Sequence, residues 1–134
     1  MSRSAEDVEN YLLKLGRTYE RAPGWTPANG TFLLRAGSGT LVAVSVSPPI
    51  ATVHVEIGPT PQDEKHRLRL FTKLLQLNAT DLMYASYGIE DGKVSLSAAL
   101  LLDSLDANEL EAALADIDVA LARHTADLVD AARE

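Results

Sequence analysis

The sequence predicts a single α+β domain over residues 1–134, in which an antiparallel sheet packs against helices in the order α-β-β-β-α-β-β-α. Three patterns support this prediction. Apolar residues recur at helical spacing in the first, middle and last parts of the chain. Between these parts, apolar and polar residues alternate with a period of two, as in a sheet that buries one face. The pair Asp91–Gly92 separates two alternating segments, which is a strong signal for a tight hairpin.

The first helix is expected to begin after Ser4, whose hydroxyl can cap it, with Glu6 and Asp7 in the first turn. An apolar stripe continues this helix and consists of Val8, Tyr11, Leu12, Leu15 and Tyr19. The segment 22–30, APGWTPANG, ends it, because two prolines and two glycines disfavour a helix. We expect Trp25, inside this segment, to pack back on the domain.

Three strands are predicted next, at residues 31–36, 40–47 and 50–58. Their valines alternate with small or polar residues, so one face of each strand is apolar and the other is not. The glycine-rich segment 37–39 joins the first two strands and Pro48–Pro49 turns the chain before the third.

A second helix is predicted over residues 60–78, with Thr60 as its cap, Pro61 in the first helical position and Asp63 as a capping-box acid. The hairpin of residues 83–100 follows, with its turn at Asp91–Gly92. Asp106 and Glu109 have the spacing of a helix start, and the last helix then carries an apolar stripe of Leu110, Leu114, Ile117, Leu121 and Leu128.

Composition argues against several classes of function. The chain has no cysteine, which excludes disulfides, thiolate metal sites and a cysteine nucleophile. Its formal net charge of −7 repels phosphate backbones, so we expect no nucleic-acid partner. No apolar run approaches the ~20 residues that span a bilayer, and the N-terminus lacks the apolar core of a signal peptide. A cytoplasmic protein without membrane contact is expected.

The sequence also lacks a recognisable catalytic or metal site. The three histidines, His54, His66 and His124, have no metal-ligand spacing; we expect the first two to be solvated and the third to be satisfied at a packing boundary. There is no nucleophile elbow around a serine, and the segment 37–40 joins two strands and lacks the lysine of a phosphate loop. We therefore expect no enzyme, no cofactor and no metal.

The second helix carries an unusually wide apolar arc. One row consists of Leu68, Phe71 and Leu75, and a second row, well over 90° away on a helical wheel, consists of Leu70, Leu74 and Leu77. Either the helix is sandwiched within its own domain, or one row meets another chain. The second alternative predicts a dimer or partner interface at Leu70, Leu74 and Leu77, bordered by Lys73.

The polar face of the sheet offers a second candidate surface. Its side chains are small and few are charged, which suits an extended peptide, although an ordinary solvated sheet face would have the same composition. The candidate residues for contact with such a client are Leu33, Ser45, His54, Tyr84 and Ser86.

The segment 70–117, LFTKLLQLNATDLMYASYGIEDGKVSLSAALLLDSLDANELEAALADI, resembles the type III secretion chaperone-like superfamily. This superfamily includes the class I secretion chaperones and the YbjN-type proteins, which are described as sensory transduction regulators. The likeness is clearest over residues 68–121 and extends to the first half only in the order of elements. It implies a non-enzymatic domain that dimerises, often through its second helix, and holds an extended segment of a client protein.

Two hypotheses for the function follow. The first is a chaperone-like, protein-binding homodimer that holds or docks a segment of a partner protein. The alternative is a regulatory or sensory module of the YbjN type that acts through a signalling partner or a small ligand.

Overall fold

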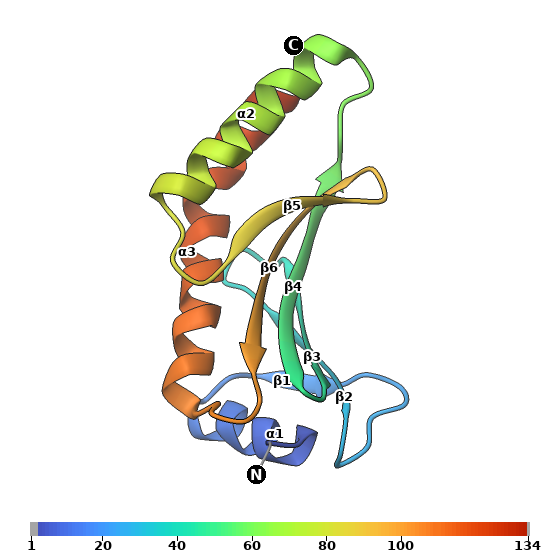
Figure 1. The fold of residues 1–134 in the computed structure, drawn as a ribbon, viewed down its shortest axis with the longest axis vertical. Coiled ribbons are helices and arrows are strands. Elements are labelled where there is room, and N and C mark those ends of the chain that lie inside the picture. The colour runs from blue at the N-terminus through green and yellow to red at the C-terminus, as the bar shows by residue number, and fades with distance from the viewer. Residues whose placement is uncertain (1–2, 134) are drawn as a thin grey trace.

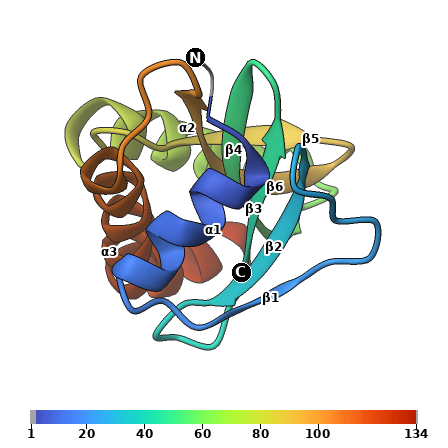
Figure 2. The ribbon, with the colours of Figure 1, turned by 90° about the horizontal axis from the view of Figure 1, so that it is seen from below.

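The computed structural model describes residues 3–133, and Figures 1 and 2 show its fold from two directions. Its elements are α1 (Ala5–Lys14), β1 (Tyr19–Arg21), β2 (Gly30–Arg35), β3 (Leu41–Ser47), β4 (Ile50–Pro59), α2 (Glu64–Thr80), β5 (Ser86–Glu90), β6 (Lys93–Leu101) and α3 (Ala107–Ala132). The predicted α+β fold with an antiparallel sheet is confirmed. One strand was not predicted, so the order is α-β-β-β-β-α-β-β-α.

The additional strand, β1, comes from the segment that the sequence pattern assigned to the end of the first helix. α1 ends at Lys14, and Gly16 follows in the left-handed conformation, with a φ of 73°, which glycine adopts without steric cost. Tyr19 therefore leaves the helical stripe and pairs with Leu34 of β2. Strand pairing overrides the helical spacing here.

The six strands form one sheet in the order β1-β2-β3-β4-β6-β5, and every neighbouring pair is antiparallel. The three helices lie on the same side of this curved sheet (Figure 2). Alternate side chains of the strands are buried beneath them, among them Phe32, Leu34, Val42, Val44, Val46, Val53, Val55, Leu96 and Ala98. The other face of the sheet is left without a helix.

The start of α2 differs from the prediction. Its N-cap is Asp63, whose carboxylate accepts a hydrogen bond from the His66 N–H at 3.0 Å, and the helix begins at Glu64. Thr60 does not cap it, because its N–H and hydroxyl both donate to the carbonyl of Gly92, at 2.9 and 3.1 Å. The hairpin turn therefore holds Thr60 and Pro61 outside the helix.

The remaining start and turn signals are confirmed. Asp91 and Gly92 have φ of 51° and 74° at the hairpin turn, as a two-residue turn with both central residues at positive φ requires. The Asp106 carboxylate caps α3 by accepting from the Glu109 N–H at 2.7 Å. The predicted stripe of α3 is buried, from Leu110 to Leu128.

Polar contacts join the N-terminal part of the chain to the rest. Arg17, after α1, binds Glu111 and Asp118 of α3 at 2.9 and 3.0 Å. Trp25 packs against Phe32, with ring centroids 5.9 Å apart, so the expected packing of this loop is confirmed.

None of the helices within residues 3–133 is long and apolar enough to cross a membrane.

Candidate partner-binding surfaces

The edge of the sheet at β5 is closed by a side chain. Tyr87 turns its N–H and C=O away from β6, and Asn78 of α2 binds both groups. Asn78 Oδ1 accepts from the Tyr87 N–H at 2.7 Å, and Nδ2 donates to the Tyr87 carbonyl at 3.0 Å. The amide thus takes the position of a neighbouring strand, and another chain cannot pair with β5 at its centre without displacing it.

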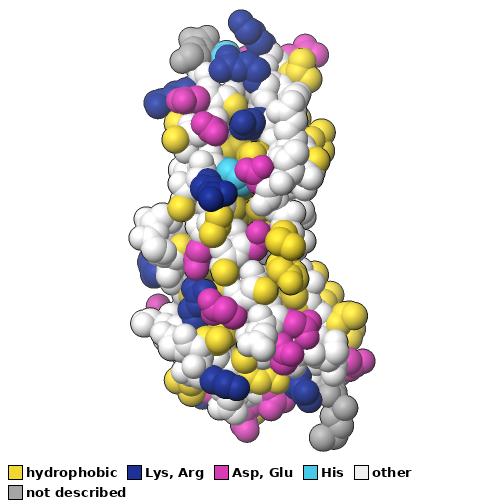
Figure 3. Space-filling model, turned by 90° about the vertical axis from the view of Figure 1, so that its left-hand side faces the viewer, with side chains coloured by type: hydrophobic (Ala, Val, Ile, Leu, Met, Phe, Trp, Pro, Cys, Tyr) yellow, Lys and Arg dark blue, Asp and Glu magenta, His cyan; other side chains and the backbone are white. Residues whose placement is uncertain are grey.

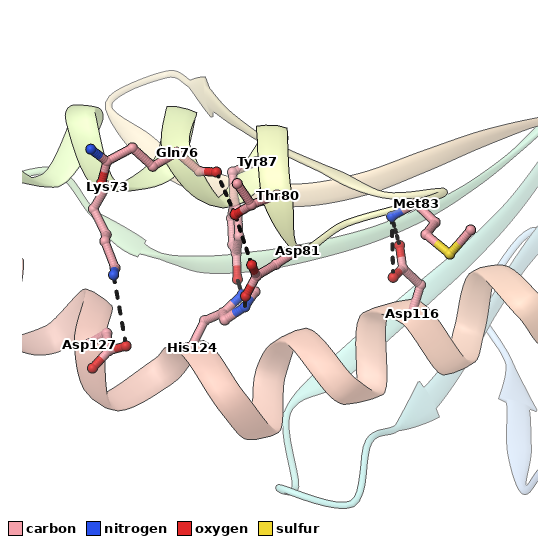
Figure 4. A network of polar contacts seen from close by, with 9 residues as sticks. All are labelled: Lys73, Gln76, Thr80, Asp81, Met83, Tyr87, Asp116, His124 and Asp127. Carbon is pink, nitrogen blue, oxygen red and sulfur yellow. Dashed lines mark hydrogen bonds and ion pairs between the residues drawn. The ribbon is translucent and has the colours of Figure 1, made fainter.

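A single carboxylate holds the loop before β5. Oδ2 of Asp116, on α3, accepts from the N–H groups of Met83, Tyr84 and Ala85 at 3.2, 2.9 and 2.9 Å; Figure 4 shows the bond to Met83. The side chains of Met83 and Tyr84 are nevertheless 86% and 51% exposed. A fixed backbone therefore presents two exposed apolar side chains next to β5.

Beneath β5, a chain of polar groups links three elements (Figure 4). Nδ1 of His124, on α3, lies 2.8 Å from the Tyr87 hydroxyl, and Nε2 lies 3.0 Å from the carboxylate of Asp81, the C-cap of α2. Burial raises the pKa of Tyr87 far above its usual range, helped by the carboxylates of Asp81 and Asp116. Hydrogen bonds from Thr80 and His124 lower the pKa of Asp81.

This chain of groups is structural. It has the order carboxylate, imidazole and hydroxyl that some nucleophiles use. However, Tyr87 and His124 are only 6% and 4% exposed, so neither polar tip meets a substrate from solvent. As expected, His124 is a satisfied histidine at a packing boundary.

The opposite edge of the sheet, at β1, is open. β1 pairs with β2 alone, and the Ala22 N–H donates to the Thr31 carbonyl at 2.8 Å. The alternation of an antiparallel ladder therefore turns the backbone groups of Tyr19 and Arg21 outward. A hollow of about 370 Å³ runs beside this edge, from Gly16–Glu20 to the end of β2.

The side chain of Arg21 fixes the open edge to the domain. Its guanidinium binds both carboxylate oxygens of Glu9, on α1, at 2.7 and 2.8 Å. The same group lies 3.7 Å from the centre of the Trp25 ring, which is a cation–π distance. The three residues hold β1 in a defined position although it is only three residues long.

The outer face of the sheet brings together most of the predicted client residues. The register of the strands sets Leu33, Ala43, His54, Ser97 and Ser86 in one row across five strands. Ser45 lies in the next row, where its hydroxyl is 3.0 Å from that of Thr31. Tyr84 precedes β5 and lies outside the strands. Three exposed apolar residues that the prediction omitted enlarge this face: Leu41, Ile50 and Leu101.

The structure corrects which apolar row of α2 faces outward. Leu70, Leu74 and Leu77 are 2%, 4% and 6% exposed and belong to the core of their own chain. Leu68 and Leu75 are 68% and 69% exposed. The helical wheel gives two rows but not the side on which the sheet lies, so the sequence could not choose between them.

Charged residues of α2 and α3 lie near the exposed Leu68. Lys73 lies 4.0 Å from Asp127 of α3, and Arg69 donates to the carbonyl of Asp130. They line a hollow of about 590 Å³ between the two helices. Figure 3, which views the side where α2 and α3 lie, shows Lys and Arg interspersed with Asp and Glu in its upper part and more Asp and Glu than Lys and Arg in its lower part.

The other histidines form no metal site. His66, expected at the surface, is 8% exposed and binds the cap residue Asp63 through Nδ1. His54 is half-buried on the outer face of the sheet. Within residues 3–133 there is no group of three or more His, Asp or Glu side chains that could hold a metal ion.

Comparison with models of known protein families identifies the family of this chain. The sequence model of CesT_Tir_1, a family of type III secretion chaperones, matches residues 1–134. This chain belongs to the CesT_Tir_1 family. The resemblance read from residues 70–117 is thereby confirmed. No curated protein sequence matches this CesT_Tir_1 protein significantly.

Solved structures share the fold of this CesT_Tir_1 protein at low sequence identity. A chain of the heterodimeric ExoU–SpcU complex from the type III secretion system of Pseudomonas aeruginosa is 22% identical, with a TM-score of 0.65, over 94% of this chain and 98% of that one. YbjN from E. coli is 12% identical, with a TM-score of 0.62, over 90% and 89%. A chain from the complex of the Yersinia pestis type III secretion chaperone SycH with a fragment of YscM2 is 13% identical, with a TM-score of 0.59, over 95% and 99%.

Two residues that define these surfaces were not predicted from the sequence. These residues are Asn78 and Asp116. Both act on backbone groups of the segment 83–87. A polar residue at the buried side of a helix end, opposite an edge strand, is the signal that could have identified Asn78.

Proposed function

We propose that this protein is a non-enzymatic, chaperone-like domain of the cytoplasm that holds an extended segment of a partner protein along the edge of β1 and the adjoining outer face of the sheet. The observation that carries the proposal is the difference between the two edges. Asn78 closes β5, whereas Tyr19 and Arg21 turn their backbone groups outward on β1.

The chemistry of an open edge suits such a segment. An added strand gains backbone hydrogen bonds that do not depend on its side chains, so one edge accepts different sequences. On the outer face beside it, Leu33, Ser45 and His54 are half-buried, and the exposed Glu20 of β1 lies opposite Leu33. A partner's alternate side chains would rest on this face and in the hollow beside β1.

The family and two structural neighbours support a protein partner. The chain belongs to a family of type III secretion chaperones. The ExoU–SpcU structure is a heterodimeric complex, and SycH is bound to a fragment of YscM2. These relatives support a role in holding another protein, and the choice of the β1 edge rests on the contacts described above.

Photo-crosslinking in the cells of origin tests the edge. A benzophenone amino acid would replace Glu20 on β1 or, as the matched control, Glu90 on β5; both side chains are exposed glutamates at opposite edges. We expect a discrete protein adduct from position 20 and none from position 90. Equal adducts at both positions, or an adduct only at position 90, would contradict the assignment of the client to β1.

We further propose that two copies associate through the exposed row of α2, Leu68 and Leu75. Exposed leucines one or two turns apart on a helix provide an apolar stripe that a second helix can cover. The buried row Leu70, Leu74 and Leu77 would support this helix from within and would not contact the second copy.

Light scattering after size exclusion tests the dimer. The monomer mass is 14.4 kDa, so we expect twice this mass for the wild type and the monomer mass for Leu75→Asp. Leu13→Asp is the matched control, because Leu13 is 62% exposed on a different helix. A wild type that elutes as a monomer, or a Leu75→Asp variant that stays dimeric, would refute the interface.

A further inference from the structure

An apolar hollow is lined by residues at the end of β4, on α2 and at the end of α3; the ends of β4 and α3 lie in the upper half of Figure 1. Its volume is about 280 Å³. Leu70, Val94 and Leu128 form its floor and are 2%, 3% and 5% exposed, whereas Val129, 44% exposed, lies at its mouth. The hollow is therefore continuous with the core at one end and open to solvent at the other.

The end of β4 creates this space. The register between β4 and β6 shifts between Glu56 and Gly58, so Ile57 is an extra residue that bends the strand. Gly58 follows without a side chain, and an added Cβ there would have no atom within 4 Å. The strand consequently leaves a gap beside the last turns of α3 that no side chain of the described residues fills.

The lining determines what could occupy the gap. Among the described residues that line it, none carries a charged side chain, and the hydroxyl of Thr125 is already bound to the Leu121 carbonyl at 2.6 Å. The hollow between α2 and α3, in contrast, is lined by Arg69, Lys73, Asp127 and Asp130. A charged ligand in the apolar hollow would lose its hydration and would meet no side chain of opposite charge.

Volume limits the size of the occupant. At the packing density of protein interiors, ~0.74, a space of this size holds about 200 Å³ of atoms, or roughly ten non-hydrogen atoms. A small apolar molecule that enters this hollow would displace water from apolar surface, which is favourable. We propose that this hollow is a binding site for an uncharged, largely aliphatic or aromatic small molecule of about this size.

Binding of 1-octanol, with octanoate as a charged analogue of equal chain length, tests this site. We expect 1-octanol to raise the melting temperature of the full chain by several degrees, because it binds the folded state alone. Octanoate should bind at least about fivefold more weakly, since its carboxylate lacks a partner in the lining. The methyl resonances of Leu70, Val94 and Leu128 should shift on titration with 1-octanol, which locates the ligand without any variant.

A matched pair of variants on α3 completes the test. Val129→Trp places a large ring at the mouth and should abolish the 1-octanol effect, whereas Val119→Trp, at a 48% exposed position of the same helix, should leave it unchanged. Methyl shifts confined to other parts of the protein would overturn the proposal. So would octanoate binding as tightly as 1-octanol, or unchanged binding by a folded Val129→Trp variant.

Discussion

Asn78 and Tyr87 form a side-chain-to-backbone pair that closes one edge of the sheet. The amide of Asn78 binds the N–H of Tyr87 at 2.7 Å and its carbonyl at 3.0 Å, as a neighbouring strand would. The pair also ties the last turns of α2 to β5. It therefore leaves β1 as the edge at which another chain can pair without first displacing a side chain.

Replacement of Asn78 by alanine should open the edge at β5. The Tyr87 N–H and C=O would lose both partners in a partly buried position, which should lower the free energy of unfolding by roughly 1–3 kcal/mol. The exposed edge should also favour self-association. Urea denaturation and sedimentation velocity measure the two effects, with Gln76→Ala, an exposed position of the same helix, as the control. A variant as stable and as monodisperse as the control would show that the pair does not protect the edge.

Leu74 and Leu75 are neighbours on α2 with opposite environments, at 4% and 69% exposure. Leu74→Ala should lower the free energy of unfolding by roughly 2–5 kcal/mol, because it leaves a cavity in the core. Leu75→Ala should change it by less than about 0.5 kcal/mol when measured at a concentration where the chain is monomeric. Denaturation with urea distinguishes the two; similar losses for both variants would mean that the orientation of α2 is wrong.

The sequence predicts the local elements of this fold well, because their signals are local. Asp106 capping α3 and Asp91–Gly92 at the hairpin depend on residues two or three positions apart, and both are confirmed. The predicted start of α2 was wrong because the carbonyl of Gly92, which is distant in the sequence, accepts a hydrogen bond from Thr60. β1 was missed because pairing with β2 determines its conformation.

The candidate surfaces were harder to predict for the same reason. The alternation along each strand assigned Leu33, Ser45, His54 and Ser86 to the outer face, but the rows that they form depend on the register between strands. The orientation of α2 about its own axis depends on where the sheet lies. Asn78 closes β5 through a contact between α2 and β5, which the residue pattern of either element alone does not predict.

Asp116 should be the main support of the loop before β5. Asp116→Ala removes the acceptor of the N–H groups of Met83, Tyr84 and Ala85 and should cost roughly 2–4 kcal/mol, since bonds to a charged acceptor are the stronger ones. Asp116→Asn keeps one acceptor oxygen and should recover part of this loss. Amide hydrogen exchange at residues 83–85 should accelerate in both variants, and more in the alanine variant. Unchanged exchange would show that the carboxylate does not hold this loop.

Acidification should destabilise the junction of α2, α3 and β5 through Asp81. Hydrogen bonds from Thr80 and from His124 lower the pKa of this carboxyl in the folded state below its value of 3.8 in an unfolded chain. A lowered folded pKa means that the unfolded chain binds the proton more readily. The contribution of Asp81 to stability is therefore complete above pH 3.8 and is lost as the pH falls through the folded pKa.

Asp81→Asn should accordingly reduce the free energy of unfolding at pH 6, and the difference from the wild type should shrink as the pH falls below 3.8. Denaturation with urea at a series of pH values measures this difference. Thr80→Val removes the hydrogen bond of 2.8 Å to Asp81, the largest cause of the lowered pKa, while His124 remains in place. In that background the Asp81→Asn difference should depend less steeply on pH. A difference that stays constant from pH 6 to pH 3 would show that Asp81 titrates alike in the folded and unfolded chains.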